Sequence, residues 1–579
     1  MCGIIGYTGS RRAAPVLVEG LKRLEYRGYD SFGVATIDKG VRFSKHQGRI
    51  FGHETEALSL PGKTGIGHTR WATHGVPNDI NAHPHLDCRN EIAVVHNGII
   101  ENYAKLRDQL TSGGHLFRSD TDTEVIVHLL EENYKGDLLD AVQKTIPLLQ
   151  GSFALLALAA GEERIVAARE KSPLVLGVGD GESYAASDIT PLLEYTERVI
   201  FLEDGDTASL VAGEINVYHQ DVAVVRPTQT VGWAVEDVKR GGFPHFMLKE
   251  IYEGPEVFSS STRAVTGSTL PEAVRSFGSA TVVACGSSYH AGLLFRYILE
   301  EEAGIPVRVD QSSEFKYYPA PVEDLVIGIT QSGETADTLA ALRVAKAHNC
   351  TTLGITNVLG SSVTRLADYS LYMRAGPEIS VAATKSFIAE IAVLLQLTNI
   401  LAGGRLDERI VRANRAMEEA LILDLSEAVL ACKDASSIFY VARGPFYPIA
   451  LEGALKMKEV SYIHAEGFAA GEIKHGPFAL LSPETPIVAI AAPGRSYPVM
   501  VSNIKEMKAR GTPIIALGEK DDRELAGIVD LLIPLPGKGE IERILSATVI
   551  LQLLAYRTAS ALGREIDRPR NLAKSVTVE

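Results

Sequence analysis

Apolar and polar residues alternate in a β-rich pattern over the first part of the chain. From Met1 to about Leu210, short apolar runs such as IIGYTG, IAVVHNG and FALLALAA are separated by turn residues, with helical periods at 12–24 and 122–133. Many strands with few helices are typical of sheets that pack on one another. We therefore predict a layered sheet sandwich for this part.

From about Val238 the pattern changes, because each apolar run is now followed by a helical period. The runs are ATVVACG, DLVIGIT, TTLGIT, SIFYVARG, PIVAIAAPG and PIIALG. This alternation is typical of a doubly wound parallel sheet. The pattern also occurs twice, with SEFKYYPAP and AEGFAAGEIKHGP at matching places in the two copies. We predict two tandem α/β subdomains.

Domain boundaries follow these changes. A chain of 579 residues exceeds the size at which single cores stop growing, about 250–300 residues. A segment with Pro, Gly and mixed charge separates the two patterns and predicts a linker. The predicted parts are a first domain at 1–225, a linker at 226–250, subdomains at 251–405 and 406–560, and a C-terminal tail at 561–579.

The composition, 46% hydrophobic and 22% charged, is that of a soluble globular protein. A net charge of −15 argues against a broad nucleic-acid surface. The cysteines form no CxxC pair, which disfavours a disulfide framework and a thiolate zinc site. We find no signal peptide, and the longest apolar stretches, such as 388–401, fall short of a membrane span. We expect a cytoplasmic protein with no membrane or nucleic-acid partner.

The chain begins Met-Cys-Gly, which makes Cys2 a candidate nucleophile. Removal of Met1 would leave one residue with both a thiol and a free α-amine. The reference pKa values are about 7.7–8.0 for the amine and about 8.5 for the thiol. The amine can therefore accept the thiol proton, as in N-terminal nucleophiles. A cysteine at position 2 by chance is the alternative.

Polar, glycine-containing turns supply groups that suit an amino-acid substrate. They are HTRWATHG, NAHPH, VVHNGIIENY and SDTDTE. Arg70 can clamp an α-carboxylate and Asp122 can pair with an α-ammonium. Asn97 and the backbone N–H of Gly98 can form an oxyanion hole. We predict no metal site and no cofactor, since no zinc-ligand spacing is matched by the histidines of these turns, His68, His74, His83, His85 and His96.

These turns, with CGIIGY and LEYRGYDS, resemble the glutaminase domain of the N-terminal-cysteine amidotransferases over roughly residues 1–230. The resemblance implies an αββα sandwich in which Cys2 attacks the glutamine carboxamide. It also implies that Asn97 and Gly98 stabilise the oxyanion. Glutamine itself would be bound by Arg70, Trp71, His83 and Asp122.

Two hydroxyl-rich loops, CGSSYHAG and TQSGETADT, follow strands of the second half. Ser and Thr hydroxyls, Gly N–H groups and a helix N-terminus suit a phosphate group. The alternative is ordinary helix capping, which favours the same residue types. Two such loops at one sheet edge favour a phosphorylated ligand. No GxxxxGK[ST] motif occurs, so nucleotide hydrolysis is disfavoured.

Later polar residues fall at spacings that suggest a reaction centre. Glu452, Lys456 and Glu459 share one helix face, which either is solvated or lines a cleft. His475 lies just beyond, in GEIKHGP. The chain ends RNLAKSVTVE, where a dangling terminus is the default. Lys574 in this tail could alternatively form a Schiff base with a sugar carbonyl.

The second half resembles tandem sugar-isomerase domains of the flavodoxin-like type, and the whole chain resembles the isomerising glutamine–fructose-6-phosphate aminotransferase family. The resemblance implies conversion of L-glutamine and fructose 6-phosphate to L-glutamate and glucosamine 6-phosphate, the first step of amino-sugar synthesis. The implied sugar-phosphate ligands are Ser287, Ser288, Thr330, Gln331, Ser332 and Thr335.

The same resemblance implies catalytic roles for four residues of the second half. Lys574 forms an imine with the open-chain ketose, and Glu459 moves the proton between C1 and C2. Lys456 stabilises charge on the enolamine. His475 opens the sugar ring in the neighbouring subunit's site, so a homodimer is expected.

Some residues depart from the family pattern. Thr330 and Ser287 stand where relatives often have Ser and Thr, so both hydroxyl groups are preserved. Ala383 stands where Ser is expected, and Phe32 replaces a smaller residue. No large insertion occurs, which disfavours the longer eukaryotic type. Two rival functions are an enzyme that aminates phosphoribosyl pyrophosphate and a sugar-phosphate sensor without turnover. The first lacks its acidic phosphoribosyl-binding stretch here, and the second has no need of the catalytic set.

Overall fold

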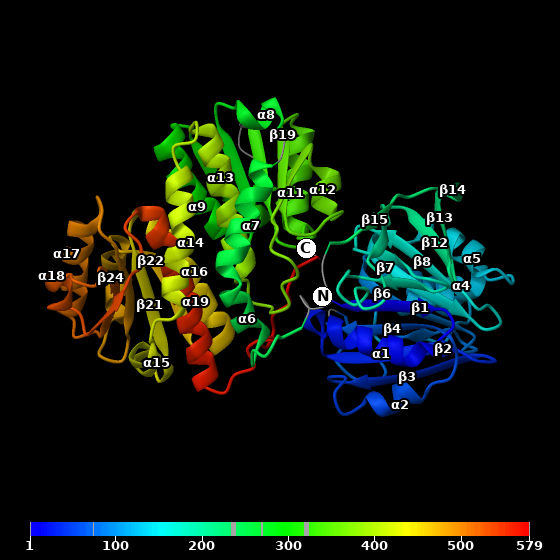
Figure 1. Cartoon of the computed structure of the whole chain (residues 1–579). Coiled ribbons are helices and arrows are strands. Elements are labelled where there is room, and N and C mark those ends of the chain that lie inside the picture. The colour runs from blue at the N-terminus through cyan, green and yellow to red at the C-terminus, as the bar shows by residue number, and fades with distance from the viewer. Residues whose placement is uncertain (1, 73, 233–238, 268–269, 318–323, 578–579) are drawn as a thin grey trace. The chain divides into compact units, whose positions relative to one another are not determined.

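The structure is a computed structural model that describes residues 2–72, 74–232, 239–267, 270–317 and 324–577. Two compact units are present, which we describe separately (Figure 1). The first unit contains Met1–Lys239 together with Ala573–Glu579, and the second contains Arg240–Leu572. Part of the predicted linker (233–238) and part of SEFKYYPAP lie outside the described residues.

The first unit contains two antiparallel sheets. The first sheet is, in spatial order, β15 (Thr228–Thr230), β11 (Arg198–Phe201), β9 (Val175–Val178), β10 (Ser183–Ala186), β1 (Gly3–Thr8), β4 (Thr64–Arg70), β2 (Ser31–Ile37) and β3 (Val41–Gln47). The second sheet is β14 (Val222–Val224), β13 (Glu214–His219), β12 (Asp206–Val211), β8 (Ile165–Glu170), β7 (Gly151–Ala159), β6 (Ile92–Ile100) and β5 (His85–Leu86). β15 pairs with β11, so this part of the predicted linker is the edge of a sheet.

Helices cover the outer faces of these sheets. They are α1 (Ala13–Leu24), α2 (Glu54–Ser59), α3 (Tyr103–Ser112), α4 (Glu124–Asn133) and α5 (Leu138–Thr145), with 3-10 turns η1 (Glu25–Arg27) and η2 (Ile146–Leu148). One apolar core lies between the sheets and includes Ile4 of β1 and Val95 of β6. A second core joins α4 and α5 to the other face of the second sheet. The predicted αββα sandwich is therefore confirmed.

The second unit contains two parallel sheets with the same strand order. One sheet is β17 (Val307–Gln311), β16 (Ala280–Ala284), β18 (Leu325–Ile329), β19 (Thr351–Thr356) and β20 (Tyr369–Tyr372). The other is β22 (His464–Ala469), β21 (Ser437–Ala442), β23 (Ile487–Ala491), β24 (Ile514–Gly518) and β25 (Leu531–Pro534). In each, the first strand in sequence lies second in space, the flavodoxin-like order. The predicted duplication is confirmed.

Helices surround both parallel sheets and join them through one core, which includes residues of α7, α9, α13, α16 and α19. The helices are α6 (Phe246–Tyr252), α7 (Gly254–Thr266), α8 (Glu272–Arg275), α9 (Gly286–Ala303), α10 (Ser312–Phe315), α11 (Ala336–Ala347), α12 (Ser362–Leu366), α13 (Lys385–Leu401), α14 (Asp407–Leu421), α15 (Ser426–Lys433), α16 (Tyr447–Ser461), α17 (Tyr497–Lys508), α18 (Arg523–Ala526) and α19 (Glu540–Ala561). The 3-10 turns are η4 (Gly444–Phe446), η5 (Glu472–His475) and η6 (Pro477–Leu480).

Among the described residues, one helix, α19, is long and apolar enough to cross a membrane. The sequence predicted that no apolar stretch is long enough to span a membrane, and that prediction missed α19. However, 83% of its most apolar window is buried inside the protein. Such burial is typical of a core helix in a soluble protein, and α19 packs against α14 and α16 in the shared core.

The contact between α16 and α19 is tight enough to test by mutation. Leu551 of α19 is 1% exposed, and a Cβ added at Gly453 of α16 would lie 2.6 Å from its Cδ1 atom. We expect Leu551→Ala to leave a cavity that lowers the unfolding free energy by about 2–5 kcal/mol. Differential scanning calorimetry should show a lower Tm for the transition of the second unit.

Leu480 of η6 provides a matched control, because its side chain is 60% exposed. Leu480→Ala removes the same atoms from a solvated position, so its Tm should stay close to that of the unmodified chain. Equal Tm losses in the two variants would contradict a shared core between α16 and α19.

Candidate active site

Cys2 lies directly before β1, the strand that pairs with β10 on one side and β4 on the other. Its Sγ atom accepts a hydrogen bond from Trp71 N (3.2 Å) and lies 3.5 Å from Trp71 O. Burial raises the pKa of the Cys2 thiol, against the lowering effects of this hydrogen bond and of the Arg70 charge. The thiol is therefore held in place but needs a base to become a nucleophile.

Asn97 and Gly98 lie on β6, which brings them to the Cys2 backbone. Asn97 Nδ2 donates to Cys2 O (2.9 Å), and within the described part of the chain Asn97 Oδ1 is buried without a hydrogen-bond partner. Gly98 has φ +130°, and a Cβ there would lie 2.0 Å from Ser152 O. Only glycine fits this position.

Arg70 and Asp122 provide opposite charges near the thiol. Arg70 ends β4 and is 3% exposed; its Nη2 donates to His74 O and to Gly75 O (3.0 Å). Its Nη1 is buried and has no hydrogen-bond partner among the described residues. Asp122, just before α4, accepts from Ile100 N (2.8 Å). An unpartnered guanidinium nitrogen and a carboxylate are what the two ends of an amino acid require.

His83 belongs to a stack of neutral imidazoles. Its ring lies on that of His68 with centroids 4.0 Å apart, and its Nδ1 accepts from His96 N (3.3 Å). Burial lowers the pKa of His83 well below its ordinary value and that of His68 to about 3. The predicted wall residue Trp71 follows β4 and meets Tyr29 edge-on at 5.8 Å. These rings can shape a pocket but carry no charge.

In the second unit, the predicted helix face is buried rather than solvated. Glu452 and Lys456 of α16 are 2% and 1% exposed. Lys456 Nζ lies 3.4 Å from Glu452 Oε1 and 2.5 Å from Glu459 Oε2. Ser287 of α9 donates to Glu452 Oε1 (2.9 Å) and lies 3.3 Å from Lys456 Nζ. The network joins the two subdomains.

Attraction between the lysine and the glutamates favours the charged form of each group in this network. Burial alone would raise the pKa of Glu452, but Lys456 and a hydrogen bond from His290 lower it. Burial alone would lower the pKa of Lys456, but Glu452 and Glu459 raise it above its ordinary value. His290, which was not among the predicted site residues, has its Nδ1 2.8 Å from Glu452 Oε2. Its position three residues after Ser287, on the same helix face, was the available signal.

The second hydroxyl-rich loop is folded on itself between β18 and α11. Thr330 Oγ1 lies 2.8 Å from Thr335 Oγ1, and Ser332 Oγ accepts from Glu334 N (3.1 Å). Thr335 is the N-cap residue of α11, yet its side chain makes no capping hydrogen bond. The Gln331 backbone carbonyl accepts from the N–H of the residue after β19, Asn357 (3.0 Å). Simple helix capping therefore does not account for these hydroxyls.

Three predicted residues lie apart from these contacts. Ser288 of α9 donates to Glu390 Oε1 (2.6 Å), so its hydrogen is used within the protein. His475 is exposed on η5 and, in the part of the chain described, makes no hydrogen bond or ion pair with Lys456 or Glu459. Lys574 lies in the tail segment that groups with the first unit.

Comparison with known proteins agrees with both units. The glutamine amidotransferase domain family matches residues 68–194, and the SIS domain family matches residues 275–400 and 431–561. A solved C-terminal domain of glucosamine-fructose-6-phosphate aminotransferase from Francisella tularensis superposes with a TM-score of 0.52 and 33% identity, covering 57% of this chain and 99% of that one.

Two curated relatives match over their full length. Glutamine–fructose-6-phosphate aminotransferase (isomerizing) of Thermococcus kodakarensis is 47% identical over 605 residues, and that of Pyrococcus horikoshii is 46% identical over 603 residues. Each alignment covers 100% of both chains. The chain therefore belongs to the family of isomerising glutamine–fructose-6-phosphate aminotransferases.

Proposed function

We propose that this protein converts fructose 6-phosphate and L-glutamine to glucosamine 6-phosphate and L-glutamate, the entry step of amino-sugar synthesis. The main support is that one chain contains two sites of different chemistry. Its first unit holds the Cys2 thiol, the Asn97 amide and the Arg70 guanidinium, and its second unit holds a buried network of a lysine with carboxylates. The first suits release of ammonia from an amide, and the second suits proton movement on a sugar. Full-length identity to enzymes of that name supports the pairing.

Glutamine hydrolysis begins with removal of the Cys2 thiol proton. Once Met1 is cleaved off, the α-amine of Cys2 takes this proton and the thiolate attacks the carboxamide carbon. An amide NH₂ has two donors, so Asn97 can hold the Cys2 carbonyl and still donate to the oxyanion beside the Gly98 N–H. The α-ammonium protonates the leaving ammonia, and water then releases glutamate from the thioester.

Substrate recognition follows from the charges around the thiol. Arg70 Nη1 binds the α-carboxylate of glutamine, and Asp122 binds its α-ammonium. The neutral His83 ring and the Trp71 side chain line the pocket.

The sugar half uses the network on α16. The phosphate is held by the hydroxyl-rich loops, through Ser287, Ser288, Thr330, Gln331, Ser332 and Thr335. His475 opens the ring, and Lys574 forms an imine at C2 with loss of water. Ammonia then replaces Lys574 at C2, and Glu459 transfers a proton from C1 to C2. The C1 hydroxyl proton passes to the C2 nitrogen, which becomes the amine as C1 becomes the aldehyde. Lys456, 2.5 Å from Glu459, offsets charge on the enolamine.

We also propose that the protein acts as a soluble cytoplasmic homodimer. His475 is exposed on η5, whereas a ring-opening acid or base works best in a shielded site. A second subunit that covers η5 would provide this shielding and place His475 in its own sugar site.

A product assay with Cys2→Ala tests the division of labour. The processed wild-type chain should form glucosamine 6-phosphate from glutamine and fructose 6-phosphate. Cys2→Ala should lose glutamine hydrolysis by about a thousandfold or more, because no other group replaces the nucleophile. Fructose 6-phosphate affinity, measured by calorimetry, should be unchanged. Cys350→Ala is the matched control and should keep both activities.

Two results would contradict this scheme. One is absence of product from wild-type chain whose Met1 has been removed. The other is loss of sugar affinity together with glutaminase activity in Cys2→Ala, since the two functions would then share one site.

Reductive trapping tests the imine. Borohydride added with fructose 6-phosphate should fix the sugar on Lys574, because an imine is reduced to a stable amine. Peptide mass spectrometry locates the adduct. Lys574→Arg keeps the charge but cannot form the imine, so its adduct should vanish. An adduct on Lys456 would overturn both lysine assignments.

Subunit mixing tests the shared site. His475→Ala and Lys574→Arg should each be inactive in amination. Half of the dimers in a fully exchanged equal mixture are mixed, and each has one intact site, so about a quarter of wild-type activity should return. Mixtures that exchange subunits, as seen by native mass spectrometry, but recover no activity would place His475 in its own subunit's site.

A further inference from the structure

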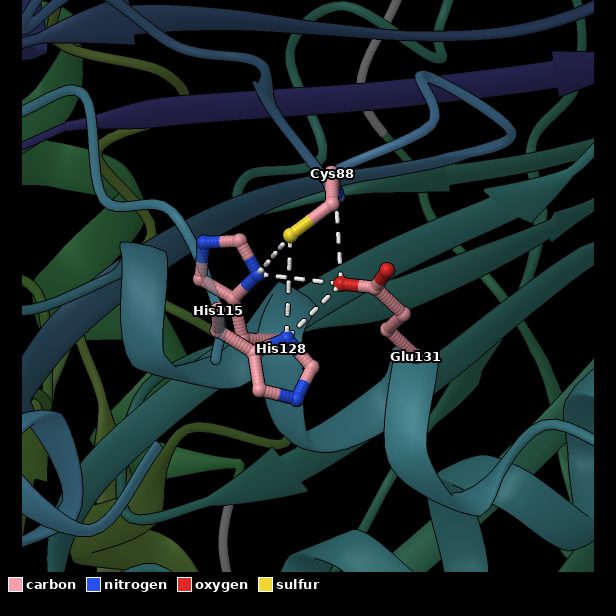
Figure 2. Close-up of side chains that lie close together, drawn as sticks. All are labelled: Cys88, His115, His128 and Glu131. Atoms are coloured by element: carbon pink, nitrogen blue, oxygen red, sulfur yellow. Dashed lines mark hydrogen bonds and ion pairs between the residues drawn. The ribbon is translucent and has the colours of Figure 1, made fainter. Parts of the chain in front are cut away.

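Four side chains of the first unit converge at a place that the reaction does not use. Cys88 follows β5, His115 lies between α3 and α4, and His128 and Glu131 share one face of α4. Figure 2 shows the thiol, two imidazoles and a carboxylate pointing toward one another. One ligand atom from each lies within 4.8 Å of all the others.

The printed distances within this cluster are close to those of a four-coordinate metal site. Cys88 Sγ lies 3.7 Å from Nδ1 of both His115 and His128. Glu131 Oε2 lies 2.9 Å from His115 Nδ1 and 3.2 Å from His128 Nδ1. Tetrahedral zinc with bonds of about 2.3 Å to sulfur and about 2.0–2.1 Å to nitrogen separates its ligand atoms by about 3.3–3.6 Å. The remaining distances between the ligand atoms are within 4.8 Å, so side-chain shifts of up to about an ångström would complete the geometry.

The outer nitrogens of both histidines face carboxylates. His115 Nε2 lies 3.4 Å from Glu132 Oε1, and His128 Nε2 lies 3.7 Å from Glu124 Oε1. Metal-bound histidines typically donate their second N–H to a carboxylate, which fixes the ring and its tautomer. With protons on Nε2, both Nδ1 lone pairs point to the centre of the cluster. A carboxylate therefore lies beside each outer nitrogen, but His128 Nε2 makes no hydrogen bond within the described part of the chain.

An ordinary polar cluster explains only part of this arrangement. Glu131 can accept hydrogen bonds from both imidazoles and from the backbone N–H of Cys88 (3.2 Å). In that reading the thiol donates only a weak hydrogen bond to one imidazole, although its sulfur lies 3.7 Å from Nδ1 of both. The backbone N–H of Leu116 also donates to this sulfur (3.4 Å), which fixes its position beside the two imidazoles.

We propose that Cys88, His115, His128 and Glu131 bind one Zn²⁺ ion through Sγ, Nδ1, Nδ1 and Oε2. A thiolate with two imidazoles selects a zinc-like transition metal over Mg²⁺ and Ca²⁺, which prefer oxygen ligands. Four protein ligands leave no open position, so the site is structural. The His115 and Glu131 side chains are 12% and 19% exposed, which leaves an entry path for the ion.

The proposed metal site lies beside the SDTDTE loop, so a bound ion would stabilise that loop. Glu124, whose carboxylate lies 3.7 Å from His128 Nε2, accepts hydrogen bonds from Arg118 N, Ser119 N and Ser119 Oγ, each 2.7 Å long. These bonds close the SDTDTE loop that carries Asp122. The ion would therefore brace the loop that positions the ammonium-binding carboxylate. This role rests on the proposed glutaminase function, whereas metal binding itself does not.

The spacing of these residues explains why the sequence analysis predicted no metal site. Zinc motifs are recognised by ligands a few residues apart. Here only His128 and Glu131 are close in sequence, at i and i+3 on a helix, and Cys88 and His115 reach them through the fold.

Metal analysis of the purified full-length chain tests the site directly. We expect about one zinc per chain by plasma mass spectrometry after dialysis against chelator-free buffer. After stripping and reloading with Co²⁺, the spectrum should show a thiolate-to-cobalt charge-transfer band and tetrahedral d–d bands. Cys88→Ser should lose the charge-transfer band, and His128→Gln should lose most of the metal. Cys350→Ser, the matched cysteine control, should keep both signals.

Two results would overturn the metal site. One is wild-type chain with native circular dichroism that holds no zinc and takes up no Co²⁺. The other is a charge-transfer band that survives in Cys88→Ser. The wild-type spectrum decides the question even if a variant fails to fold.

Glutaminase kinetics test the bracing role separately. Removal of zinc should raise KM for glutamine about tenfold, with less effect on kcat, because Asp122 loses its fixed position. Zinc addition should restore KM, and affinity for fructose 6-phosphate should not change. An unchanged KM would contradict the bracing role. A chain that binds zinc but hydrolyses no glutamine would instead contradict the proposed function and leave the metal site standing.

Discussion

The proposed nucleophile, Cys2, lies directly before β1, so its position depends on that strand. β1 can fix this position because it pairs in register with β4 and β10 and every residue from Gly3 to Thr8 is buried. A strand paired on both sides is stiff. Apart from Asp122, the other groups of the site also come from strands or from turns beside strands. Asn97 is on β6 and Arg70 ends β4, so the sandwich itself sets the distances to the thiol.

The second unit has a different constraint, because it contains charged side chains that are buried in its interior. Burying Lys456 and Glu452 costs solvation free energy, and their attraction offsets that cost only if each polar atom has a partner. Ser287, His290 and Glu459 supply these partners from two helices that belong to different subdomains. Such a network adds little to stability compared with apolar packing. Its retention at the contact between α9 and α16 is therefore best explained by the chemistry proposed for the sugar.

The hydrophobic pattern predicted the sandwich, the parallel sheets and their duplication, because apolar runs and helical periods are local signals. Contacts between segments far apart in the sequence were harder to predict, because no local pattern indicates them. The sequence placed Glu452 and Lys456 on one face but left open whether water covers it, since burial depends on α9 and α19. α19 was overlooked as a long apolar helix because charged residues interrupt its first turns. His290 and the Cys88 cluster involve partners far apart in sequence, and no spacing rule connects them.

The two units also differ in where they need support. In the parallel sheets, the hydroxyl-rich loops run directly from a strand into a helix, so both ends of each loop are fixed. In the sandwich, the loop that carries Asp122 follows a segment without regular structure between α3 and α4. Such segments have high conformational entropy, and ordering them costs about 1–2 kcal/mol per residue. A cross-link between Cys88, His115 and α4 lowers that cost in the unbound enzyme. A metal brace is therefore expected beside a loop with little secondary structure to fix it, which is where the four proposed ligands lie.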